Sequence, residues 1–136
     1  MQAQAVIDHI VNWLKDYAAQ AHAKGFVVGI SGGIDSAVVS ILAAKTGLPT
    51  LLLELPIRQQ ADQVNRAKLH MQQLQARFDN VSADSVDLTP TFNQFAADND
   101  VSAEQFTNKE LALANARSRL RMLTLYYYGQ LHGLLV

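Results

Sequence analysis

The sequence predicts an α/β fold, in which helices cover both faces of a doubly wound parallel sheet. Apolar runs of strand length alternate along the chain with longer stretches of helical periodicity, a pattern typical of parallel sheets with crossover helices. A glycine pair, Gly32-Gly33, joins the first apolar run to a helical stretch. Such turns lie at the carboxyl edge of these sheets, where ligands bind. With 136 residues, 49% of them hydrophobic, we expect a single domain, 1–136, with a substantial core.

The first half of the chain is expected to contribute two strands to the interior of the sheet. The predicted elements are a helix at about 4–24, a strand at 26–30, a helix at about 35–46 and a strand at 50–55. The second helix consists almost entirely of small or apolar residues, so we expect it to be buried against the sheet. The second strand is a continuous apolar run interrupted only by Glu54, which suits an inner strand.

The second half is expected to complete the sheet on both sides. Its predicted elements are a helix at about 61–78, a strand at 81–88, a short helix from 89 to about 98, a long helix at about 108–132 and a fourth strand at 134–136. The third strand is polar, so we place it at an edge. Thr89 is the predicted N-cap of the short helix and Pro90 its first residue.

Composition excludes several classes of function. A net charge of −1 leaves no broad basic surface for nucleic acid. Because the chain has no cysteine, it has no disulfide, thiolate metal site or cysteine nucleophile. No apolar run approaches the length of a membrane span, and the first residues do not resemble a signal peptide. We therefore expect a cytoplasmic protein without nucleic-acid or membrane partners.

The stretch Ser31-Gly32-Gly33-Ile34-Asp35-Ser36 carries the clearest chemical signal. Adjacent glycines let the backbone approach a ligand closely, and the helix that follows presents free N–H groups and a positive dipole end. Serine hydroxyls can bind phosphate oxygens, and an aspartate is a hard oxygen ligand for magnesium. The predicted phosphate-binding residues are Ser31, Gly32, Gly33, Asp35 and Ser36. The alternative is an ordinary turn with Asp35 or Ser36 as N-cap.

A second signal lies on the long helix, in Asn115-Ala116-Arg117-Ser118-Arg119-Leu120-Arg121-Met122. Asn115, Arg119 and Met122 are spaced by four and three residues and so share one helical face. Guanidinium groups bind phosphate and carboxylate through paired hydrogen bonds. The alternative is a half-exposed helix whose arginines bury their stems and keep their charges in water.

Together the two stretches resemble a known family. The Ser-Gly-Gly-x-Asp-Ser string resembles the pyrophosphate loop of the N-type ATP pyrophosphatases, which belong to the adenine nucleotide alpha-hydrolase-like superfamily. Within that group, the Asn-x-x-Ala/Ser-Arg-x-Arg-Met pattern resembles NAD synthetase. The resemblance implies a carbon–nitrogen ligase that adenylates deamido-NAD with ATP, releases pyrophosphate, and then amidates the adenylate with ammonia to give NAD and AMP. No side chain is expected to act as a covalent catalyst.

The resemblance also implies roles for individual residues. Mg²⁺ would bind Asp35, Gln60 would lie near the adenine of ATP, and Asn115, Arg119 and Arg121 would bind deamido-NAD. Glu54 stands where many members carry an arginine, just before Leu-Pro.

The resemblance further implies a strand order of 3-2-1-4-5 and a homodimer. The chain resembles the amino-terminal half of the family and stops after strand four, so we expect little or no synthetase activity from it alone. Five residues of the long helix are candidates for a dimer interface or for the core: Leu123, Leu125, Tyr127, Tyr128 and Leu131. The alternatives are another N-type ATP pyrophosphatase and a catalytically incompetent nucleotide-binding or interaction module.

Overall fold

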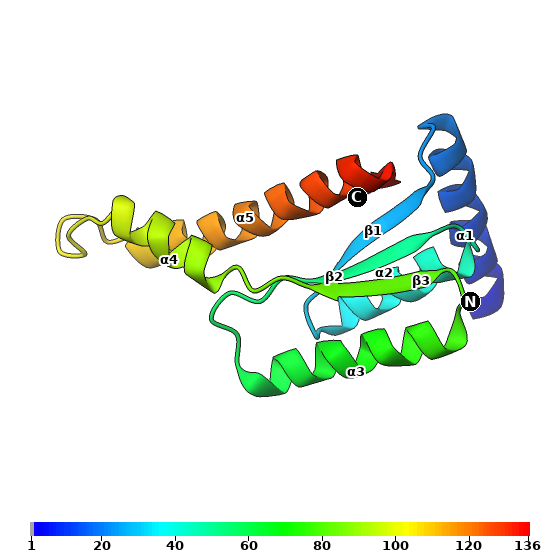
Figure 1. Cartoon of the computed structure of the whole chain (residues 1–136), viewed down its shortest axis with the longest axis horizontal. Helices are drawn as coiled ribbons and strands as arrows, with labels where there is room; N and C mark the ends of the chain where they lie inside the picture. Colours follow the sequence, from blue (N-terminus) through cyan, green and yellow to red (C-terminus); the bar gives the residue numbers. More distant parts are fainter. Residues whose placement is uncertain (1) are drawn as a thin grey trace.

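The predicted α/β class and strand order are confirmed for the strands present. The computed structural model describes residues 2–136. Its elements are α1 (Ala3–Gln20), β1 (Gly25–Ile30), α2 (Ile34–Lys45), β2 (Thr50–Glu54), α3 (Ala61–Arg77), β3 (Val81–Ser85), α4 (Thr89–Asp98), α5 (Lys109–His132) and β4 (Leu134–Leu135). The four strands form one parallel sheet in the order β3-β2-β1-β4 (Figure 1). As expected, the polar third strand lies at an edge.

The strand register brings three residues to the carboxyl edge of the sheet. Ile30 of β1 pairs with Glu54 of β2, and Glu54 pairs in turn with Ser85 of β3. β4 adds only a short ladder, through two residue pairs at the start of β1. Within residues 2–136, the carboxyl half of β1, next to the turn into α2, pairs with β2.

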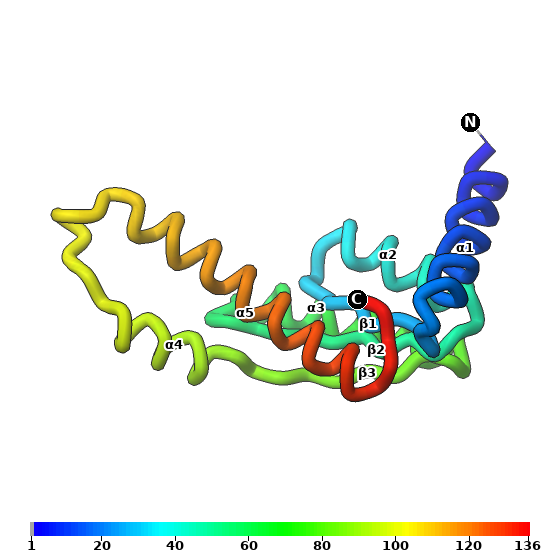
Figure 2. Tube along the Cα trace, turned by 90° about the horizontal axis from the view of Figure 1, so that it is seen from above, coloured from blue at the N-terminus to red at the C-terminus, as the bar shows by residue number. Residues whose placement is uncertain are grey.

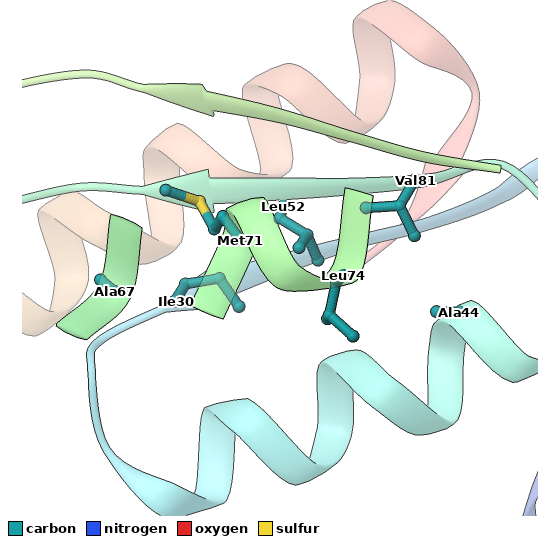
Figure 3. Packing of buried hydrophobic residues seen from close by; sticks show 7 residues of the cluster. All are labelled: Ile30, Ala44, Leu52, Ala67, Met71, Leu74 and Val81. Carbon is teal, nitrogen blue, oxygen red and sulfur yellow. The ribbon is translucent and has the colours of Figure 1, made fainter. Parts of the chain in front are cut away.

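Helices form a layer on each face of the sheet. α2 and α3 cover one face, and α4 and α5 lie on the other (Figures 1 and 2). Figure 3 shows the first core cluster, in which side chains of α2 and α3 meet those of the strands. Its buried members are Ile30, Ala44, Leu52, Ala67, Met71, Leu74 and Val81. Beyond the sheet, α4 and the start of α5 run side by side, so this pair projects past the carboxyl edge.

The expectation that the second helix is buried was wrong for half of its surface. Ser40, Ala43 and Ala44 are buried, but Ile34 is 76% exposed and Val38 and Val39 are about half exposed. Within residues 2–136, α2 contacts β1, β2, α1 and α3, and these neighbours leave Ile34, Val38 and Val39 uncovered. The apolar composition of α2 therefore did not predict which of its residues are buried.

Two predicted boundaries also need correction. The N-cap of α4 is Leu88, and Thr89 is the first helical residue. The Thr89 hydroxyl accepts a hydrogen bond from the backbone N–H of Arg58 at 3.0 Å. A tertiary contact has thus replaced the expected local cap. The third strand ends at Ser85 rather than at 88, although Leu88 still donates to the carbonyl of Pro56. Pro56 lacks the N–H that a regular ladder needs.

Among residues 2–136, no helix is both long and apolar enough to cross a bilayer.

A buried serine of α2 contacts a histidine of α3. From this contact we expect the free energy of unfolding to depend on pH. The Ser40 hydroxyl, fully buried, lies 2.7 Å from Nε2 of His70 and donates to the Ala37 carbonyl at 2.7 Å. Burial lowers the pKa of His70 below its usual 6.5. The unfolded chain therefore binds the proton more readily, so the stability from neutral His70 is complete above about pH 6.5 and falls as pH drops below it.

We expect the urea concentration at the unfolding midpoint to decrease when the pH is lowered from 7.5 to 5.5. The decrease should be smaller in His70→Gln. The exposed His9, replaced by glutamine, is the matched control and should keep the pH dependence of the unchanged protein. Parallel pH profiles for the unchanged protein and His70→Gln would contradict this prediction.

Candidate functional site

The turn between β1 and α2 is held close to α3 and requires glycine. Gly32 has φ of +86°, in the left-handed region that favours glycine. A Cβ added there would lie 2.7 Å from the backbone oxygen of Gln63, near the start of α3. The loop therefore brings its backbone within contact distance of a neighbouring helix, an approach that any larger residue would prevent.

Serine hydroxyls brace this loop from inside. The Ser36 hydroxyl accepts the Ser31 N–H and donates to the Gly33 carbonyl, and the Ser31 hydroxyl accepts the Gly33 N–H, each at 3.2 Å. The two hydroxyls also lie 3.2 Å apart. Gly33 is the N-cap of α2 and no side chain caps the helix. The predicted alternative, with Asp35 or Ser36 as N-cap, is therefore wrong, and the first N–H groups of α2 have no side-chain acceptor.

Asp35 lies in the first turn of α2, exposed beside the loop. Within residues 2–136 its carboxylate makes no hydrogen bond or ion pair, and no cluster of three or more metal-binding side chains occurs. Magnesium in nucleotide sites is commonly held by one or two carboxylates together with substrate phosphates and water. A single aspartate without a side-chain partner in the described chain, beside a glycine turn at a helix N-terminus, fits that pattern.

A cavity of about 250 Å³ opens beside this loop at the carboxyl edge of the sheet. Its walls come from the ends of β1 and β2, from α3 and from α5. The lining residues are Gly29, Ile30, Ser31, Leu53, Glu54, Leu55, Pro56, Gln59, Gln63, Val64, Arg121 and Leu125. Pockets for whole drug-sized ligands usually measure about 300–1,000 Å³. This cavity therefore has room for one ring system rather than for a complete nucleotide.

Among the described residues that line the cavity, Arg121 is the one with a cationic side chain. Its Nε donates to the Leu55 carbonyl at 3.0 Å, and among residues 2–136 no carboxylate pairs with it. Burial, together with repulsion from Arg117, lowers the pKa of this guanidinium. A half-buried positive charge without a counter-ion favours an anionic ligand at this edge of the sheet.

The structure separates the other predicted residues from Arg121. Asn115 and Arg119 are exposed, whereas Arg121 is half-buried. Residues two apart on an α-helix point in directions about 200° apart, so Arg119 lies on the opposite face of α5 from Arg121. Gln60 is exposed at the N-cap position of α3 and does not line the cavity. Its neighbours Gln59 and Gln63 line the cavity instead.

Two further arginines lie against the ring of Phe92: Arg58, which no motif singled out, and Arg117, which belongs to the second motif stretch but was given no individual role. The guanidinium carbon of Arg58 lies 5.2 Å from the centroid of the buried Phe92 ring, and that of Arg117 lies 5.4 Å from it. Arg58 also donates to Asn93 Oδ1, with Nε at 2.8 Å, and has a left-handed backbone with φ of +52°. No local pattern signals this cluster, because its members come from a loop and from two helices that meet only in the fold.

Comparison with known proteins extends the likeness over the whole chain. The NAD synthase family model matches residues 6–136. The NH3-dependent NAD+ synthetase of Malacoplasma penetrans is 35% identical over 132 residues, which are 96% of this chain and 49% of that protein. The chain thus spans about half the length of the curated relatives it matches.

Solved structures show the same architecture. The structure of NMN synthetase from Francisella tularensis is 36% identical, with a TM-score of 0.84 over 98% of this chain and 52% of the other. NH3-dependent NAD synthetase from Campylobacter jejuni also gives a TM-score of 0.84, at 23% identity, and covers 100% of this chain and 56% of the other. The second likeness concerns the fold alone.

Proposed function

Because this chain belongs to the NAD synthase family, we propose that it provides the ATP-binding part of a carbon–nitrogen ligase that converts deamido-NAD to NAD. In the proposed reaction the nicotinate carboxylate attacks the α-phosphate of ATP and expels pyrophosphate. Ammonia then displaces AMP from the adenylate. The observation that carries the proposal is the glycine-dependent loop, which leads into the uncapped N-terminus of α2 beside a cavity at the carboxyl edge of the sheet.

The proposed chemistry relies on charge and position rather than on a covalent intermediate with the protein. Backbone N–H groups of residues 31–36 and the positive end of α2 would hold the pyrophosphate. Asp35 would hold Mg²⁺, which when bound supplies positive charge to the phosphate oxygens. Arg121 would offset negative charge at the cavity, and Asn115 and Arg119 would contact deamido-NAD from the outer face of α5, as the family resemblance implies.

Magnesium-dependent ATP binding tests this proposal. We expect Asp35→Ala to weaken binding of ATP in the presence of Mg²⁺ by at least about 10-fold, because losing even an indirect metal partner costs about 10- to 100-fold in metal affinity. Isothermal titration calorimetry with and without Mg²⁺ measures the change. The matched control is Asp16→Ala, on the exposed surface of α1, which should bind like the unchanged protein. Unchanged affinity in Asp35→Ala would contradict the metal role, and a pure interaction module would bind neither ATP nor Mg²⁺.

A mononucleotide acceptor is the second candidate. The chain is 36% identical to a protein described as an NMN synthetase, over 98% of its length. Amidation of nicotinic acid mononucleotide would use the same adenylation chemistry on a smaller substrate. Binding of deamido-NAD and of the mononucleotide, compared in the same calorimeter, distinguishes the two, because the correct acceptor should bind more tightly. Another N-type ATP pyrophosphatase would bind neither.

A homodimer and a cytoplasmic location complete the proposal. Of the five interface candidates, Leu125 and Tyr128 pack against the core cluster of α4 and α5. Leu123, Tyr127 and Leu131 are each about 60% exposed and are the apolar side chains available for a partner. Light scattering of the concentrated protein measures its mass, and a monomer at high concentration would contradict the dimer.

A further inference from the structure

Arg58 has a backbone conformation that arginine rarely adopts. It lies in the irregular segment between β2 and α3, and its φ of +52° falls in the left-handed region. Among residues 2–136, His22 is the one other non-glycine residue with a positive φ. A residue with a side chain stays in this region only when surrounding contacts hold it there, and such residues cluster at functional sites. The contacts of Arg58 therefore require an explanation.

Three contacts attach Arg58 to the start of α4. Its backbone N–H donates to the Thr89 hydroxyl at 3.0 Å. Its Nε and Nη2 both donate to Oδ1 of Asn93, with Nε at 2.8 Å. Its guanidinium carbon lies 5.2 Å from the centroid of the Phe92 ring, within the range of a cation–π interaction. Because no carboxylate pairs with Arg58 in the described chain, its charge is directed to α4 rather than to an acidic neighbour.

The attached segment is part of the cavity wall. Pro56 and Gln59, on the two sides of Arg58, both line the cavity. Before Arg58, Ile57 is 3% exposed and belongs to the core cluster on the α4 and α5 face of the sheet. After Arg58, neither Gln59 nor Gln60 makes a side-chain hydrogen bond within residues 2–136. Arg58 therefore makes the last polar tertiary contact of this wall before α3 begins.

We propose that Arg58 is a positioning residue, which holds the cavity wall at residues 56–60 against α4 in the arrangement that receives ATP. This inference rests on the proposed function, since it takes ATP as the ligand. Arg58 does not line the cavity, so its effect reaches the ligand through the segment that it holds. A wall that is in place for only a fraction of the time lowers the apparent affinity by that fraction. The glycine loop is a different segment, so binding of pyrophosphate alone should not depend on Arg58.

Trypsin cleavage after Arg58 tests the attachment to α4. Trypsin takes the arginine side chain into its specificity pocket, so Arg58 must leave Asn93 before the bond to Gln59 is cut. When local opening is fast compared with cleavage, the cleavage rate follows the population of the open form. Asn93→Ala removes the acceptor of Nε and Nη2, and we expect this bond to be cut roughly 3- to 10-fold faster, the scale of an ordinary hydrogen bond.

Gln94→Ala is the matched control for the cleavage experiment. Gln94 is the exposed neighbour of Asn93 on α4, and its side chain donates to Asp98 rather than to the segment at 56–60. This variant should be cut after Arg58 at the rate of the unchanged protein. Equal rates for Asn93→Ala and the unchanged protein would overturn the attachment.

Calorimetric titration of the full chain tests the effect on binding. In Mg²⁺, we expect Arg58→Ala and Asn93→Ala each to weaken ATP binding by roughly 3- to 10-fold and to leave pyrophosphate binding unchanged. Because both changes remove the same contact, the double variant should lose no more than Arg58→Ala alone. Asn93→Asp offers a charged acceptor to the same guanidinium and should keep the ATP affinity of the unchanged protein. A merely structural role would instead lower the affinity for ATP and for pyrophosphate alike.

The remaining outcomes separate this inference from the proposed function. Unchanged ATP affinity in Arg58→Ala, or equal losses for ATP and pyrophosphate, would overturn the positioning role while ATP binding stands. Failure of the unchanged protein to bind either ATP or pyrophosphate would overturn the proposed function and the positioning role together. Faster cleavage of Asn93→Ala would in that case still support the attachment of Arg58 to α4.

Discussion

Replacing Gly32 with alanine is expected to reduce binding of ATP and of pyrophosphate by roughly 10- to 100-fold, the loss expected when one hydrogen bond to a charged group is displaced. The new Cβ would lie 2.7 Å from the backbone oxygen of Gln63, so the loop and α3 would have to move apart. The φ of +86° adds a conformational cost of about 1–3 kcal/mol for a residue with a side chain. Both effects displace the N–H groups that would face the phosphates. Calorimetric titration with pyrophosphate measures the loss.

Gly47→Ala is the control that separates the backbone strain of a positive φ from the displacement of the loop away from α3. Gly47 has a similar φ of +79°, but nothing lies within 4 Å of the position of its added Cβ. We expect this variant to lose stability in urea and to bind pyrophosphate like the unchanged protein. If Gly32→Ala retained the affinity of Gly47→Ala, the close approach of the loop to α3 would have no part in binding.

Replacing Phe92 with alanine is expected to destabilise the protein by about 3–5 kcal/mol, the usual range for a large buried side chain. Its ring is 1% exposed and belongs to the core cluster that joins α4 to β1 and β2. Arg58 and Arg117 both lie against it, so its removal also takes away the surface that positions these two cations. Urea unfolding followed by circular dichroism measures the change in free energy of unfolding.

Phe95→Ala is the matched control on the same helix. Phe95 lies one turn further along α4 and is 48% exposed, with its ring centroid 6.5 Å from that of Phe92. The expected loss is below about 1 kcal/mol, because little apolar surface becomes exposed to water. Equal destabilisation by the two changes would show that α4 is not anchored through the Phe92 ring.

Much of the fold could be predicted because the strands are strongly patterned. The apolar runs of β1 and β2 occur where expected, and the polar composition of β3 correctly placed it at an edge. The turn at Gly32 was also predictable, because two adjacent glycines between a strand and a helix have few other structural uses. Local composition reports such features directly, since each depends on the backbone and on burial of a short segment.

Local patterns failed where a neighbour distant in sequence decides the outcome. Thr89 lost its predicted capping role to a hydrogen bond with Arg58, thirty-one residues away along the chain. The apolar residues of α2 predicted burial, but the neighbours that α2 has in the described chain leave Ile34, Val38 and Val39 exposed. In both cases the missing information was which element lies alongside, and intrinsic propensity does not contain it.

The sequence by itself determined the class of the fold, the family, and the loop from Ser31 to Ser36 as the proposed phosphate site, because those features are carried by contiguous residues. Only the tertiary structure decided which side chains share the cavity with that loop. In the fold, Arg121 lines the cavity, whereas Arg119 is exposed on the other face of α5. Glu54 is buried, and one of its carboxylate oxygens has no hydrogen-bond partner in the described chain. The physical reason is that a cavity is formed where separate strands and helices meet, so its lining follows from strand register and helix rotation rather than from spacing along the chain.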